Sequence, residues 1–124
     1  MEDNDDNPTV ERASKRLKSE LRVYYGPSQQ TILSSFSVDL STGGLYLQTE
    51  YPLVVDDVLM LIFSLPGQGK SVSCKARVAW SNSESDSRKQ ELPPGVGLQF
   101  VDLPLEDLML ISTFIEKYEV EAAW

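Results

Sequence analysis

The run VLMLIFSLPGQGKSVSCKARVAW, at residues 58–80, is the strongest indicator of fold class in this chain. From Val58 to Leu65 it is almost continuously apolar, which is typical of a strand covered on both sides. The turn formers at residues 66–69 follow, and polarity then alternates from Ser71 to Trp80. The predicted inward face of this second strand comprises Val72, Cys74, Ala76, Val78 and Trp80. The run therefore predicts an antiparallel hairpin with one buried face.

Four further segments have strand patterns, at residues 17–25, 31–39, 45–49 and 95–101. In the first, the residues predicted to share one face are Leu17, Ser19, Leu21, Val23 and Tyr25. In the second, the apolar face comprises Ile32, Phe36 and Val38. Residues 81–94 are polar, charged and end in proline, so we expect a long mobile loop there.

The last segment of the chain has the pattern of a helix. Asp102 is a suitable cap, Pro104 suits a first turn, and two acidic residues that follow match the positive end of a helix dipole. The apolar positions that recur at helical spacing are Leu108, Ile111, Ile115 and Tyr118. Six short strands and one helix favour a mainly β fold, an antiparallel barrel, because closure removes exposed edges. The helix is expected to cover one barrel opening or to offer a surface to a partner.

Length and composition indicate one domain. With 124 residues, 41% of them apolar, the chain can fill a single modest core. Residues 1–10 are acidic and nearly free of apolar side chains, so we expect a disordered tail before one domain at residues 11–120. No apolar run approaches the roughly 20 residues that cross a bilayer, and the N-terminus lacks the features of a signal peptide. We therefore expect a cytoplasmic protein that does not insert into membranes.

Composition also limits the chemistry. Histidine is absent and Cys74 is the only cysteine, which removes histidine-assisted nucleophiles, internal disulfides and most zinc sites. We expect Cys74 to be a buried thiol, and we predict neither enzymatic activity nor a metal or cofactor. The net charge of −8 argues against binding a nucleic-acid polymer, because lysine and arginine supply most of such affinity.

Positive charge is concentrated near the start of the domain. Five of the eleven basic residues occur between residues 12 and 22, namely Arg12, Lys15, Arg16, Lys18 and Arg22. This concentration suits capture of a small anion, whereas the acidic remainder would repel a polymer. The alternative is a solvated basic strand face, which composition alone would favour.

Two clusters could form a ligand site at the rim of the predicted barrel. Arg12 and Arg16 precede the first strand, and a guanidinium binds phosphate as well as the O6 and N7 acceptors of guanine. At the end of the second strand, Asp39 could accept from the N1 and N2 donors of guanine, and Ser41 could donate a hydroxyl hydrogen bond. A guanine nucleotide fits this combination.

Two glycines complete the second cluster. Gly43 and Gly44 would let the backbone turn with positive φ and approach a ligand closely. Singly, such signals usually mark an ordinary turn. The order and separation of the two clusters, and their placement against the strands, make the pair specific.

With these motifs the sequence resembles the PilZ domain family. The family pattern RxxxR matches RASKR at residues 12–16, and (Asp or Asn)-x-Ser-x-x-Gly matches DLSTGG at residues 39–44. The segments ARVAW at 76–80 and GVGLQF at 95–100 resemble later strands of the family, so the likeness covers about residues 11–118. It implies a six-stranded barrel with a flexible N-terminal arm, which binds the bacterial second messenger cyclic di-GMP and signals to a downstream protein.

The resemblance also implies residue roles. Arg12 and Arg16 would grip phosphate and guanine, and the turn would enclose the other side of a guanine through Asp39, Ser41 and Gly44, next to Gly43. Lys15 lies inside the first motif and Trp80 at the barrel rim, so both are further candidates.

Two positions differ from the usual family pattern. Glu11 stands where many members carry another arginine, which favours one ligand molecule over a stacked pair, and Gln99 stands where a basic residue is frequent. On this reading, ligand binding orders the N-terminal arm and so produces the signal. The alternative is a PilZ-like adaptor that binds no ligand and acts through protein contacts.

Overall fold

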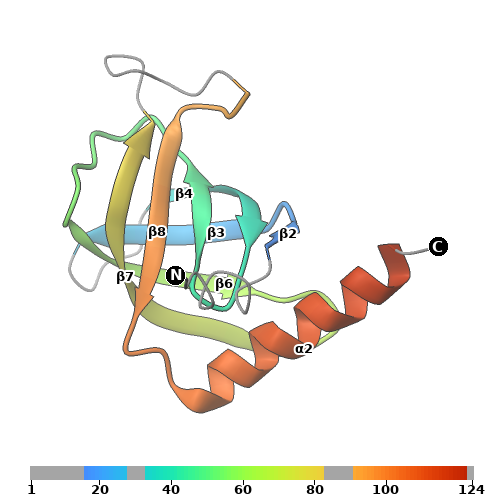
Figure 1. Ribbon diagram of the computed structural model, residues 1–124. Helices are drawn as coiled ribbons and strands as arrows, with labels where there is room; N and C mark the ends of the chain where they lie inside the picture. Colours follow the sequence, from blue (N-terminus) through green and yellow to red (C-terminus); the bar gives the residue numbers. More distant parts are fainter. Residues whose placement is uncertain (1–15, 28–32, 83–90, 123–124) are drawn as a thin grey trace, which may run out of the picture.

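The computed structural model describes residues 16–27, 33–82 and 91–122 (Figure 1). The expected acidic tail at residues 1–10, Arg12, Lys15, Ile32 and residues 83–90 of the expected loop lie outside the described residues.

The described residues form seven strands and one helix. They are β2 (Leu17–Lys18), β3 (Arg22–Pro27), β4 (Leu33–Leu40), β5 (Gly44–Gln48), β6 (Val58–Ser64), β7 (Ser71–Asn82), β8 (Gly95–Val101) and α2 (Leu105–Ala122). Every strand pairing is antiparallel, in the order β2-β4-β3-β6-β7-β8-β5, and β5 also pairs with β4. This last pairing closes the sheet (Figure 1). Because β2 and β3 pair with the same strand, β4, they act as one interrupted strand, and the predicted six-stranded barrel is confirmed.

A buried serine explains the interruption between β2 and β3. The hydroxyl of Ser37 donates to the carbonyl of Ser19 (2.6 Å) and accepts from the amide of Leu21 (3.0 Å). The register with β4 shifts by one residue between the pairs Lys18–Asp39 and Arg22–Phe36. The hydroxyl therefore satisfies backbone groups that a regular ladder would have paired.

The core fills the barrel and is covered at one end by α2. The helix lies across one end of the barrel (Figure 1), and its buried residues Ile111, Phe114 and Ile115 join the inward faces of the strands. The expectation that the helix covers a barrel opening is confirmed. The helix begins at Leu105, and the amide of Leu108 donates the first helical hydrogen bond to the carbonyl of Pro104. Pro104 therefore occupies the cap position, and the expected cap, Asp102, lies two residues too early in the chain.

Two predicted strand faces were wrong. In β4 the face containing Phe36 points outward, and this ring is 36% exposed while Ser37 and Leu40 are buried. The outward position of the Phe36 ring is stabilised by the guanidinium of Arg22, which lies 4.6 Å from the centre of the ring. In β6 only one face is fully buried, since Val58 is exposed and the helix covers an end of the barrel instead of this outer face.

Trp80 also departs from the predicted inward face. The register of β7 with β8 shifts between the pairs Val78–Leu98 and Trp80–Gly97, so Ala79 is an extra residue. This bulge turns the indole to the outside of the barrel, where it is 37% exposed. No helical segment within the described residues has both the length and the apolar character needed to cross a membrane.

Candidate functional site

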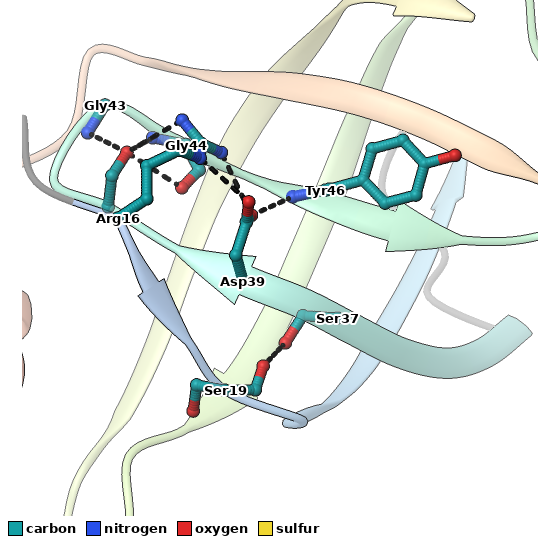
Figure 2. A network of polar contacts seen from close by, with 8 residues as sticks. Arg16, Ser19, Ser37, Asp39, Gly43, Gly44 and Tyr46 are labelled. Atoms are coloured by element: carbon teal, nitrogen blue, oxygen red, sulfur yellow. Dashed lines mark hydrogen bonds and ion pairs between the residues drawn. The ribbon is translucent and has the colours of Figure 1, made fainter. Parts of the chain in front are cut away.

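Arg16 and Asp39 meet at the end of β4. Arg16 immediately precedes β2, which pairs with the last residues of β4. The Nε of Arg16 donates to Oδ2 of Asp39 (2.9 Å), and its Nη2 donates to Oδ1 (3.0 Å), as Figure 2 shows. The Arg16 side chain is 49% exposed and that of Asp39 is 22% exposed. The pair is therefore a bidentate ion pair that stays accessible to solvent.

The hydroxyl of Ser41 organises the following turn. It accepts from the amides of Gly43 (3.1 Å) and Gly44 (3.2 Å), and it lies 3.2 Å from the carbonyl oxygen of Gly44, to which it can donate. The Nη1 of Arg16 also donates to this hydroxyl, at 3.4 Å. Because Ser41 is only 1% exposed, its contacts in this structure lie within the turn and with Arg16.

The two glycines of the turn do not have the predicted backbone conformation. Among the described glycines, positive φ values occur at Gly67 and Gly69, and not at Gly43 or Gly44. Gly44 is required for another reason, since a Cβ atom there would collide with the carbonyl oxygen of Leu98 on β8. The glycine therefore allows β5 and β8 to approach each other closely.

The carboxylate of Asp39 has one further partner. Its Oδ1 accepts from the backbone amide of Tyr46 (3.0 Å), as Figure 2 shows. Three N–H groups thus point at a carboxylate with about four acceptor positions. Asp39 can accept one more hydrogen bond without losing Arg16, and a second only if Arg16 moves.

An aromatic pair lies beside the carboxylate on the same outer face. The rings of Tyr46 and Trp80 are 5.4 Å apart and inclined at 35°. The hydroxyl of Tyr46 donates to the carbonyl of Pro93 (2.6 Å) and accepts from Nδ2 of Asn82 (3.2 Å). A side chain at Gly97 would collide with the indole, so the ring of Trp80 lies directly over this glycine. These contacts hold the indole in place as a partly exposed flat surface.

The predicted site residues are therefore largely brought together. Arg16, Asp39, Ser41 and the two glycines form one cluster, and Trp80 lies on the same barrel face through Tyr46. Sequence reasoning missed Tyr46. This residue follows the two glycines and stands between two leucines that are buried, so strand alternation would have predicted that its ring points outward. Arg12 and Lys15 lie outside the described residues.

Cys74 lies in the core, as predicted. Burial, with a smaller contribution from the negative charge of Asp107, raises the pKa of its thiol to about 12. The thiol therefore stays protonated at neutral pH, which makes it a poor nucleophile.

The described residues thus form a closed antiparallel barrel with a C-terminal helix, and Arg16 contacts both Asp39 and Ser41 at one end of β4. A family model of the PilZ domain matches residues 11–117. The chain belongs to the PilZ domain family, a family of cyclic di-GMP receptors.

Two solved structures share this fold. The inhibitor of motility MotI/DgrA from Bacillus subtilis is 17% identical with a TM-score of 0.71, over 87% of this chain and 51% of that one. The PilZ domain of CeSA from a cellulose-synthesizing bacterium is 15% identical with a TM-score of 0.60, over 86% of this chain and 99% of that one. This chain thus spans about half the length of the motility inhibitor. No curated protein matches the sequence significantly.

Proposed function

We propose that this chain binds cyclic di-GMP through its RxxxR arm and its Asp-x-Ser-x-x-Gly turn, and relays binding to a downstream protein. The observation that carries the proposal is the docking of Arg16 on Asp39 and Ser41, because it brings two motifs 23 residues apart into one cluster whose arginine is half-exposed. Membership of the PilZ family supports the identity of the ligand.

Arg16 is well placed to bind an anion. Asp39 engages Nε and Nη2, which fixes the plane of the guanidinium and leaves Nη1 with only the long contact to Ser41. A guanidinium carries five N–H donors, so a phosphate or the O6 and N7 edge of guanine can still be bound. Arg12 lies four residues before Arg16 in the sequence and is proposed to supply the second cation.

The turn and the aromatic pair take different roles. We assign Ser41 and Gly44 mainly to shaping the turn, and Asp39 to orienting Arg16 and accepting from guanine. The exposed face of Trp80 offers a stacking surface for a base, because the indole is held by Tyr46 and lies over Gly97. Lys15 lies beside Arg16 in sequence and adds positive charge near the ligand phosphates.

The relay is proposed to begin at the arm. Ligand contacts by Arg12 and Arg16 would fix the segment that leads into β2. α2 contacts β2, and both Leu17 and Tyr118 pack against the core. A change in the arm therefore has a short physical path to the helix, whose exposed side could face a partner. The cytoplasmic location and the absence of catalysis remain predictions.

One observation favours a second function, that of a ligand-free adaptor. α2 exposes two large apolar side chains one turn apart, Leu105 (69%) and Met109 (60%), which would suit contact with a protein.

Titration calorimetry with cyclic di-GMP separates these functions. We expect saturable heat with cyclic di-GMP and little with cyclic di-AMP, because adenine lacks the O6 acceptor and the N1 and N2 donors that this site would read. Circular dichroism of the same sample establishes that the barrel is folded. Absence of binding by the folded protein would reject the receptor function and leave the adaptor function as the better account.

A further inference from the structure

The outer face of the barrel continues from the candidate site onto two neighbouring strands. Gly44 on β5 is the register partner of Gln99 on β8, which in turn is the partner of Arg77 on β7. All three lie on the outer face, because the adjacent residues Leu98 and Ala76 are buried in the core. Since neighbouring strands lie roughly 4.8 Å apart, Arg77 is about 10 Å from Gly44 across the sheet.

Arg77 is held at this position by two side chains. Its Nη1 donates to Oδ1 of Asp56 (2.7 Å), and its Nη2 donates to Oε1 of Gln99 (2.6 Å). The second contact directs the amide nitrogen of Gln99, a hydrogen-bond donor, away from Arg77. Arg77 is 40% exposed, so its guanidinium remains accessible from the outer face.

Asp56 is fixed by the loop before β6. Its amide donates to the carbonyl of Val78 and the amide of Val78 donates to the carbonyl of Asp57, both at 2.8 Å. Asp56 also has a φ of 79°, a left-handed conformation that aspartate and asparagine tolerate better than most residues. Its carboxylate is thus presented to Arg77 by a braced backbone, and it competes with any anion for this guanidinium.

A cyclic dinucleotide needs more than one anchor. It carries two phosphates and two bases around one ring, so the cluster at Arg16 can hold only part of it. Between that cluster and Arg77 the outer face contains Gly44 on β5, which has no side chain that could block a ligand, whereas the indole of Trp80 covers Gly97 beside this path. A ligand anchored at Arg16 would therefore extend over β8 toward Arg77 and Trp80.

We propose that Arg77 and Gln99 form a second anchor for the far side of the ligand, and that Asp56 weakens this anchor by pairing with Arg77. The proposal rests on the proposed function, binding of cyclic di-GMP. Arg77 would bind the second phosphate or a guanine edge, and the amide nitrogen of Gln99 would donate to the ligand beside Gly44.

The test compares opposite substitutions within the ion pair, by titration of cyclic di-GMP. Arg77→Ala is expected to raise Kd roughly tenfold, because a charge-assisted contact is lost. Asp56→Asn is expected to lower Kd by a factor of about two to five, because Arg77 is released while asparagine keeps the left-handed backbone. The Kd of Arg77→Lys should lie between those of the wild type and Arg77→Ala, since lysine keeps the positive charge but cannot make the bidentate contact of a guanidinium.

Lys75→Ala is the matched control, because Lys75 is an exposed cation on the same strand and the same outer face, two residues from Arg77. It should leave Kd within about twofold of wild type, since Lys75 lies outside the proposed anchor and an exposed charge without a direct partner contributes little. Thermal unfolding of each variant shows whether the barrel is intact. If Arg77→Ala does not fold, Gln99→Ala and Arg77→Lys provide the comparison.

Two outcomes would overturn this inference alone: wild-type affinity in Arg77→Ala while Arg16→Ala loses binding, or equal weakening by Asp56→Asn and Arg77→Ala. The second would show that the ion pair acts only by holding the loop. Failure of the wild-type protein to bind cyclic di-GMP would instead overturn the proposed function, and this inference with it.

Discussion

Replacement of Arg16 by alanine is the most direct test of the site. Arg16 makes two charge-assisted bonds to Asp39, at 2.9 and 3.0 Å, and a longer one to Ser41. Because the arginine is half-exposed, the ion pair contributes no more than about 1 kcal/mol to the free energy of unfolding. A hydrogen bond between a ligand and a charged group contributes roughly 1.5–3 kcal/mol, so we expect binding of cyclic di-GMP to weaken by about tenfold to a hundredfold.

The two effects can be measured on the same samples. Titration calorimetry gives Kd, and urea unfolding gives the change in stability. Arg22→Ala is the matched control, because it removes the same charge from an exposed arginine that contacts Phe36 and Ser34 instead of the turn. Equal Kd values for Arg16→Ala, Arg22→Ala and wild type would show that Arg16 does not contact the ligand.

Three further predictions concern the scaffold. Gly44→Ala should lower the free energy of unfolding by about 2 kcal/mol or more in a urea titration, because its Cβ would collide with the Leu98 carbonyl, and an unchanged midpoint would contradict this reading. Ser37→Ala should cost about 1–3 kcal/mol by the same measurement, since two backbone groups lose their buried partner; Ser35→Ala, on the same strand, is its control. Cys74 should make stability fall as pH rises from 9 toward 12, because the unfolded thiol loses its proton near 9.0 and the folded thiol only near 12. Below pH 9 the contribution of the Cys74 thiol to the free energy of unfolding is fully present. Between pH 9 and 12 the Cys74→Ala variant should lose less stability than the wild type.

The overall fold could be predicted because most strands alternate regularly. The structure confirms the predicted inward face of Leu21, Val23 and Tyr25, because all three side chains are buried inside the barrel. Predictions failed where one residue is inserted into a ladder. The extra residue Ala79 turns the side chain of Trp80 from the inside of the barrel to the outside. The register shift near Ser37 likewise accompanies a Phe36 side chain that points outward. Neither irregularity has a clear signature in the local sequence.

The site was predictable in part for a similar reason. The meeting of Arg16 with Asp39 follows from their placement at the ends of neighbouring strands, and the structure confirms it. The role of Gly44 was misread, because its constraint comes from a carbonyl oxygen 54 residues later in the chain. The ion pair of Asp56 with Arg77 likewise depends on cross-strand register, which a local pattern does not contain.

The collision that a side chain at Gly44 would make has a consequence for how relatives of this barrel are interpreted. A relative that no longer bound a nucleotide would still need this glycine, because β5 and β8 could not otherwise pair so closely. The fold would not require such a protein to keep Arg16, which is half-exposed. Retention of the glycine therefore says little about whether such a protein still senses a messenger, whereas retention of the arginine says a great deal.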